Sequence, residues 1–110
     1  MRKLLAVAVP AILAAALAVP ALGAPAPKTK AVKLGDNFFS PTSLKLKHGT
    51  KVVWTWVGSS DHNVTWLSGP SERFHSRDMT SGSYSHTFKK KGTYKLICTI
   101  HGFTMKVKVT

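Results

Sequence analysis

Short segments with an apolar residue at every second position constrain the fold of this chain most strongly. Two of the clearest rows are Tyr94, Leu96, Cys98 and Met105, Val107, Val109. Successive side chains of a strand point to opposite faces of a sheet, so a period of two predicts strands with one buried face. No stretch beyond the first 23 residues has a clear 3.6-residue period, although residues 67–82 could form a short helical turn. The pattern therefore predicts an all-β domain.

Turns that contain glycine separate the expected strands. One such turn joins the expected strands 43–47 and 50–57, and another joins the expected strands 83–88 and 93–98. Strands 50–57 and 93–98 both run from their turns toward loops that contain histidine and cysteine. We therefore expect these loops at one end of the domain and the two turns at the other. Such an arrangement predicts a β-sandwich with a single functional end.

The first 23 residues have the three parts of an export signal. A positively charged start precedes an almost wholly apolar run at 4–19, and Ala21-Leu22-Gly23 places small residues at the cleavage positions. We expect a signal peptide at 1–23 that is cleaved after Gly23; an uncleaved membrane anchor is the alternative. The protein is therefore expected in the periplasm, at the cell surface or outside the cell.

Beyond the leader, the chain is expected to form one small and strongly basic domain. Residues 24–30 are expected to be a flexible tether, and residues 31–110 the folded domain. Without Arg2 and Lys3, fourteen of the sixteen basic residues remain with all four acidic ones, a formal charge of +10. This charge favours an acidic protein or an anionic cell-envelope surface as partner, and an exported chain would rarely meet nucleic acid. We expect a monomer.

The only cysteine, Cys98, lies in a segment rich in metal-binding side chains. With a histidine upstream, the pattern is His62-x35-Cys98-x2-His101-x3-Met105. A thiolate, two imidazoles and a thioether together favour copper over the commoner biological metals. A lone cysteine cannot form an internal disulfide, and a free thiol outside the cytoplasm is open to oxidation. The pattern therefore predicts a copper site.

Each of these residues also has a structural explanation when it is considered alone. Cys98 could be a buried, unreactive cysteine, and Met105 begins an inward-facing row and could belong to the core. Either histidine of the pattern could be an ordinary loop residue. Their joint occurrence, in this order and spacing, favours the metal site. Of the other histidines, His48 and His86 are expected to be structural, and the sequence does not assign His75.

Four motifs occur together along residues 31–110. They are Asp36-Asn37-Phe38-Phe39-Ser40-Pro41, Leu44-x-Leu46-x2-Gly49-x2-Val52-x-Trp54, His62-Asn63-Val64 and Phe88-x3-Gly92-Thr93-Tyr94-x3-Cys98-x2-His101. In combination they resemble the cupredoxins, the type 1 blue copper proteins, and in particular the plastocyanin, pseudoazurin and amicyanin branch. The resemblance implies a Greek-key β-sandwich of about seven to eight strands that holds one type 1 copper ion, cycles between Cu(I) and Cu(II), and carries single electrons.

The resemblance also implies roles for individual residues. His62 and His101 would bind copper through imidazole nitrogens, Cys98 through its thiolate, and Met105 through a long axial bond from sulfur. Asn63 would tie the two ligand loops together by hydrogen bonds. Three residues separate His101 from Met105 here, where these proteins have two or four.

The sequence favours a small electron carrier over three other classes of protein. Copper sequestration or delivery in the cell envelope is the main alternative. A fragment of a multicopper enzyme is disfavoured because the chain is short and has no His-x-His pair for further copper centres. A sugar- or wall-binding module without metal is the remaining class. We therefore expect a redox protein as partner and no enzymatic activity.

Overall fold

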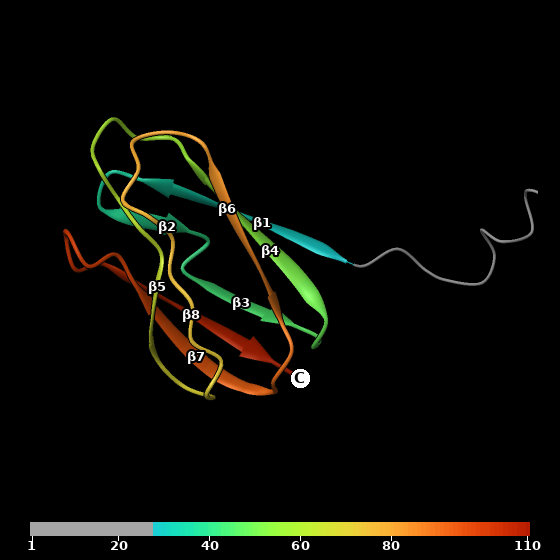
Figure 1. The fold of residues 1–110 in the computed structure, drawn as a ribbon. Helices are drawn as coiled ribbons and strands as arrows, with labels where there is room; N and C mark the ends of the chain where they lie inside the picture. The colour runs from blue at the N-terminus through green and yellow to red at the C-terminus, as the bar shows by residue number, and fades with distance from the viewer. Residues whose placement is uncertain (1–27) are drawn as a thin grey trace, which may run out of the picture.

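Eight strands form two sheets in a computed structural model that describes residues 28–110 (Figure 1). The strands are β1 (Thr29–Gly35), β2 (Phe38–Ser40), β3 (Ser43–Leu46), β4 (Thr50–Trp56), β5 (Thr65–Ser68), β6 (Ser83–Phe88), β7 (Gly92–Ile97) and β8 (Thr104–Val109). One sheet has the strand order β2-β1-β4-β6, and the other has the order β3-β8-β7-β5. The predicted all-β sandwich is confirmed.

Each of the two sheets contains one parallel pair of strands among antiparallel pairs. β1 runs parallel to β4, and β3 runs parallel to β8, whereas the remaining pairs are antiparallel. Parallel neighbours need a connection that crosses from one end of the sheet to the other. The chain therefore passes repeatedly between the two sheets, and both sheets contain strands from early and late parts of the sequence.

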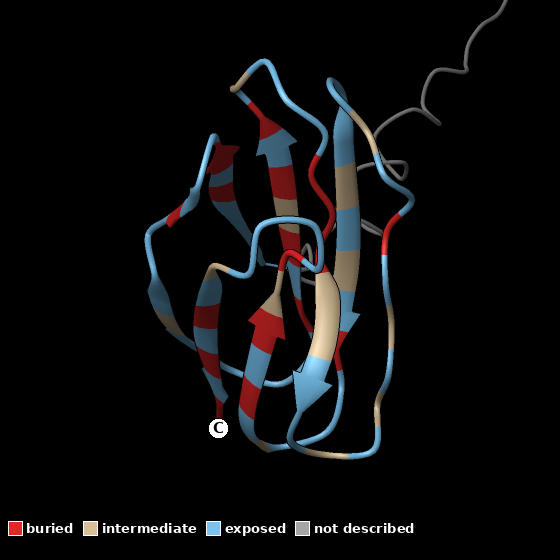
Figure 2. Ribbon diagram, turned by 90° about the vertical axis from the view of Figure 1, so that its left-hand side faces the viewer, coloured by how far each residue is buried: buried red, intermediate tan, exposed pale blue. Residues whose placement is uncertain are grey.

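The core lies between the sheets and is made by the inward row of each strand. Figure 2 shows buried and exposed residues alternating along the strands. On β4 the indole of Trp54 is fully buried, with the rings of Phe74, Tyr84 and Phe88 at centroid distances of 6.0–6.3 Å. Aromatic rings bury large apolar areas and supply much of the energy of small cores. The ring of Phe88 also packs 4.9 Å from that of Tyr94 on β7, so this aromatic cluster connects the two sheets.

The outward row of the β3-β8-β7 surface is rich in lysine. Lys45 on β3 lies opposite Lys108 on β8, and Lys95 on β7 lies opposite Lys106 on β8. All four are exposed, and no ion pair involving a lysine occurs between residues 28 and 110. Like charges directly opposite each other on a sheet are destabilising. This face therefore reduces the stability of the fold to a small extent.

The strands expected at 43–47, 50–57, 83–88 and 93–98 are present with their ends shifted by one residue at most, whereas two other parts of the chain differ from expectation. β1 begins at Thr29, so the last two residues of the expected tether belong to a strand that pairs with β4. Residues 67–82 form no helical turn: they begin at the end of β5 and continue as an irregular connection with single bridges from His75 to Thr65 and from Met79 to His62. The expected signal peptide and the start of the tether lie outside the described residues.

Between residues 28 and 110 the structure contains no helix with the length and apolar character needed to cross a membrane.

Glu72 fastens the long connection between β5 and β6 to the turn that precedes β7. Its carboxylate accepts hydrogen bonds from His86 Nε2 at 2.7 Å and from the backbone N–H groups of Lys89 and Lys90 at 3.0 and 2.8 Å. Partial burial raises the pKa of Glu72, but the hydrogen bonds from His86 and the two N–H groups outweigh it and leave the pKa below its ordinary value of 4.5. Glu72 therefore stabilises the fold in its charged form.

The substitution Glu72→Gln is expected to lower the free energy of unfolding at pH 7 by about 1–3 kcal/mol, because a neutral amide replaces a charged acceptor. A group whose pKa is lower in the folded state contributes fully above its unfolded pKa and loses that contribution as the pH falls through its folded pKa. The difference between wild type and variant should therefore shrink below about pH 4.5, as measured by urea unfolding. Lys91→Gln in the same exposed turn is the control. An equal loss at pH 3 and pH 7 would contradict this account.

Candidate metal centre

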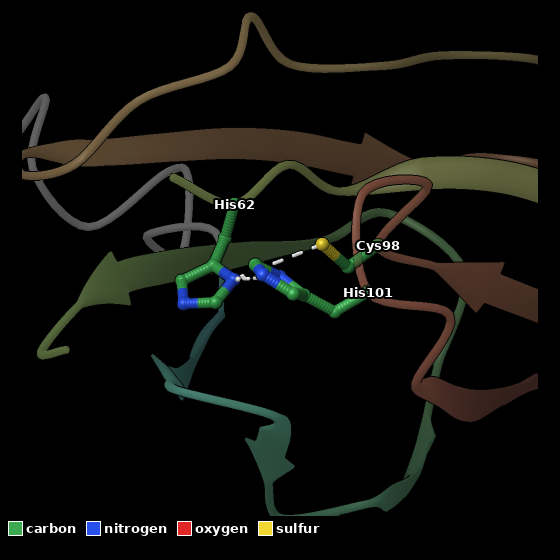
Figure 3. Close-up of side chains that lie close together, drawn as sticks. All are labelled: His62, Cys98 and His101. Carbon is green, nitrogen blue, oxygen red and sulfur yellow. Dashed lines mark hydrogen bonds between the residues drawn. The ribbon is translucent and has the colours of Figure 1, made fainter. Parts of the chain in front are cut away.

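Two loops at one end of the sandwich bring three metal-binding side chains together. His62 follows β4, Cys98 comes directly after β7, and His101 lies in the loop between β7 and β8. Their nearest ligand atoms all lie within 4.8 Å of one another. Figure 3 shows His62 facing Cys98 and His101 across the gap between the two loops. The prediction that the two loops share one end is confirmed.

The downstream loop is a short turn closed by the strands on either side of it. The N–H of Cys98 donates to the carbonyl of Phe103 at 3.0 Å, and the N–H of Gly102 donates to the carbonyl of Cys98 at 2.8 Å. Gly102 has φ of +84°, in the left-handed region that glycine adopts without strain. The turn reverses the chain within four residues and holds His101 beside Cys98.

The upstream loop is fixed by hydrogen bonds to the backbone of His62. Its N–H donates to the carbonyl of Met79 at 2.9 Å, and its carbonyl accepts from the N–H of Met79 at 3.0 Å. The same carbonyl accepts a hydrogen bond from Trp56 Nε1 at 3.1 Å. Trp56 gives no recognisable signal in the sequence, because its effect depends on a loop that folds back over it.

The donor atoms of the cluster are Nδ1 of both imidazoles and the sulfur of Cys98. His62 Nδ1 lies 3.8 Å from Cys98 Sγ and 3.2 Å from His101 Nδ1. His62 and Cys98 are fully buried, whereas His101 is exposed. A thiolate and two imidazoles suit copper. The donors converge without any strand having to move, so this chain's residues fit a single ion of this kind.

Asp36 determines which nitrogen of His62 is available to a metal. This residue lies in the turn between β1 and β2, and its Oδ1 accepts a hydrogen bond from His62 Nε2 at 2.8 Å. Because a carboxylate can only accept, Nε2 carries the proton, and Nδ1 keeps its lone pair toward Cys98. The hydrogen bonds from His62 and from the N–H groups of Ser60 and Ser59 hold the pKa of Asp36 well below its ordinary value.

The close approach of Asp36 to the upstream loop also explains a glycine there. A side chain at Gly58 would collide with the carboxylate and the backbone of Asp36. Sequence reasoning included Asp36 only in an opening motif and did not place it near His62. The two are 26 residues apart, and only the parallel pairing of β1 with β4 brings them together.

Asn63 makes the hydrogen bonds between the two ligand loops that the resemblance implied. Its Oδ1 accepts from the N–H of Thr99 at 3.1 Å, and its Nδ2 donates to Thr99 Oγ1 at 2.8 Å. Nδ2 also donates to Asp78 at 2.8 Å, and Thr65 Oγ1 donates to Oδ1 at 2.8 Å. All the hydrogen-bonding capacity of this amide is therefore directed at holding the loops in place.

The remaining candidates contact other residues. Met105 is the second residue of β8, and its sulfur accepts a hydrogen bond from Trp54 Nε1 at 3.3 Å. Its axial role therefore stays a prediction from the sequence. His75 Nδ1 contacts the carbonyl of Ser76, and His86 is paired with Glu72.

Comparison with known proteins agrees with this fold and cluster. A family described as copper binding proteins of the plastocyanin/azurin family matches residues 28–110. Amicyanin-alpha from Methylorubrum extorquens is 40% identical over 102 residues, which cover 86% of this chain and 84% of that protein.

Solved structures of cupredoxins are also similar to this chain. A novel purple cupredoxin from Nitrosopumilus maritimus has a TM-score of 0.67 at 26% identity, covering 74% of this chain and 99% of the other. A reduced amicyanin variant has a TM-score of 0.68 at 27% identity, covering 78% and 86%. The chain belongs to the plastocyanin/azurin family of copper-binding proteins. Its cofactor is copper, as the sequence predicted.

The substitution Asp36→Asn is expected to lower copper affinity by about 10- to 100-fold, because a neutral amide no longer holds the Nε2 proton of His62 firmly. Competition with a chelator of known affinity measures the change. Asp61→Asn is the matched control, since it removes the same charge from the exposed residue next to His62, and no hydrogen bond of the Asp61 side chain occurs within residues 28–110. If both substitutions lowered copper affinity equally, the negative charge near His62, and not the orientation of its ring by Asp36, would be responsible.

Proposed function

We propose that this protein is an exported electron carrier in which His62, Cys98 and His101 hold one type 1 copper ion. The observation that carries the proposal is the convergence of two imidazoles and one thiol within 4.8 Å at one end of a β-sandwich. Bound copper would supply a Cu(I)/Cu(II) couple that takes up and releases one electron at a time. The positively charged leader with its apolar run supports export.

The protein's own contribution is a site that need not rearrange. His62 is held from both sides, by Asp36 at Nε2 and by its backbone bonds to Met79. Asn63 connects the loop of His62 to the loop of Cys98. Ligands fixed in this way by surrounding hydrogen bonds keep one geometry for both oxidation states of a metal. Such a scaffold suits repeated electron transfer better than substrate turnover.

The exposed ring of His101 supports a contact point for a redox partner. His101 is the only exposed member of the cluster, and the neighbouring side chain of Ile100 is also exposed. An exposed apolar side chain beside the accessible histidine offers a small apolar contact for a partner that binds and dissociates. The charge of +10 beyond the leader favours a partner with an acidic surface.

The substitution Cys98→Ala is expected to abolish the strong blue colour of the Cu(II)-loaded protein, since that absorption arises from a bond between thiolate and copper. Visible absorption and electron paramagnetic resonance spectra of wild type and variant measure the loss. His75→Ala, which lies outside the cluster, should leave both spectra unchanged. A Cys98→Ala variant that stays blue would exclude this thiolate as a ligand.

Redox behaviour separates electron transfer from copper handling. An electron carrier should cycle reversibly between its two oxidation states and retain its copper when mixed with an apo-acceptor protein. A protein for sequestration or delivery should bind Cu(I) tightly, exchange electrons slowly or transfer the ion. Voltammetry of the loaded full-length protein and copper analysis after mixing give the answer, and transfer of the ion would contradict the proposal.

A further inference from the structure

We propose that Phe103, and not Met105, borders the fourth side of the copper site, so that the ion has three protein ligands and no thioether. This inference rests on the proposed function, because it concerns the same copper. It selects the second of two roles that the sequence left open for Met105, namely axial ligand or core residue.

The pairing of β7 with β8 places Met105 away from the ligand loop. Met105 lies opposite Leu96, two residues before Cys98. Two residues along a strand correspond to about 6.6 Å. Phe103, in contrast, lies opposite Cys98, since its carbonyl accepts the hydrogen bond from the Cys98 N–H. The residue that lies directly opposite Cys98 across the ligand loop is therefore Phe103, and Met105 lies two positions further along β8.

The sulfur of Met105 already has a partner inside the core. Trp54 Nε1 donates to it at 3.3 Å, and both side chains are almost completely buried. No other acceptor for this indole N–H occurs among residues 28–110. A buried donor without an acceptor is costly, so turning the sulfur toward the metal would destabilise the core. The indole cannot follow, because the rings of Phe74 and Phe88 pack against it.

The ring of Phe103 lies against both imidazoles of the cluster. Its centroid is 5.5 Å from that of His62 in an edge-on arrangement and 6.4 Å from that of His101 in a nearly parallel one. On its other side it packs 5.0 Å from the ring of Phe39. A phenyl ring has no atom that can donate to copper. It fills the space beside the two ligands with an apolar group.

No further histidine, cysteine or acidic side chain converges with the three ligand atoms of the cluster in the described part of the chain. Among residues 28–110 the three-membered cluster is the one group of three or more histidine, cysteine or acidic side chains with converging ligand atoms. An axial donor tunes the potential of a copper–thiolate site, and a thioether supplies electron density to Cu(II). Phe103 should therefore keep the reduction potential higher than it would be with a sulfur at that position.

Two matched substitutions test the assignment in the full-length, copper-loaded protein. Phe103→Met places a thioether beside the imidazoles and should lower the reduction potential and shift the visible and electron paramagnetic resonance spectra. Met105→Leu keeps the volume of the core residue and should leave the potential and both spectra unchanged while changing the fluorescence of Trp54. Met79→Leu, at the other methionine of the described residues, is the control for loss of any thioether.

The outcomes separate this inference from the proposed function. A shifted potential in Met105→Leu, or unchanged spectra in Phe103→Met, would overturn the role of Phe103 while wild type remained a blue copper protein. A wild type that binds no copper or shows no blue colour would overturn the proposed function itself. Thermal unfolding of each apo-variant identifies one that fails to fold. If a variant fails to fold, X-ray absorption at the copper edge of selenomethionine-labelled wild type replaces it. A selenium neighbour of copper would overturn the inference, and the absence of one would support it.

Discussion

The antiparallel pairing of β7 with β8 is the constraint on which the site depends. It places the cysteine at the end of one strand and closes the following loop with a hydrogen bond from Cys98 to Phe103. Within that loop His101 has little freedom, and Met105 follows on β8, where its sulfur accepts a hydrogen bond from Trp54. A shift of this register by one residue would turn every inward side chain of β8 outward. The composition of the site is therefore a consequence of strand register as much as of the residues present.

A second constraint comes from the first strand pair. β1 runs parallel to β4, so the turn after β1 reaches the same end of the sandwich as the loop after β4. Asp36 in that turn orients the buried histidine and also binds the N–H groups of Ser59 and Ser60. One carboxylate thus positions both a ring and the backbone that leads to it. The buried histidine of the cluster is therefore held by residues from two distant parts of the chain.

The sequence was sufficient to predict the fold class, the shared end of the two ligand loops and the copper cofactor, because each depends on a local pattern. Alternation marks strands, glycine marks turns, and Cys98-x2-His101 with His62 indicates a soft metal. The contacts of Asp36 and Trp56 were not predictable in this way, since they arise only when separate strands pair. Met105 shows the same limit: its spacing is that of a ligand and its alternation is that of a core residue. The register of β8 and the position of Trp54 are the observations that bear on the choice between these two interpretations.

The opposed lysines on the outer face of the sandwich bear on how two molecules meet. Lys45 faces Lys108 and Lys95 faces Lys106 across neighbouring strands, so this surface carries a dense field of one sign. Two copies that approached through it would repel each other, and the charges also discourage pairing between sheets of different molecules. Encounters between like molecules are therefore directed away from this broad side. These four lysines lie on strands and not in the loops at the end that presents His101, so their repulsion acts on one face of the molecule.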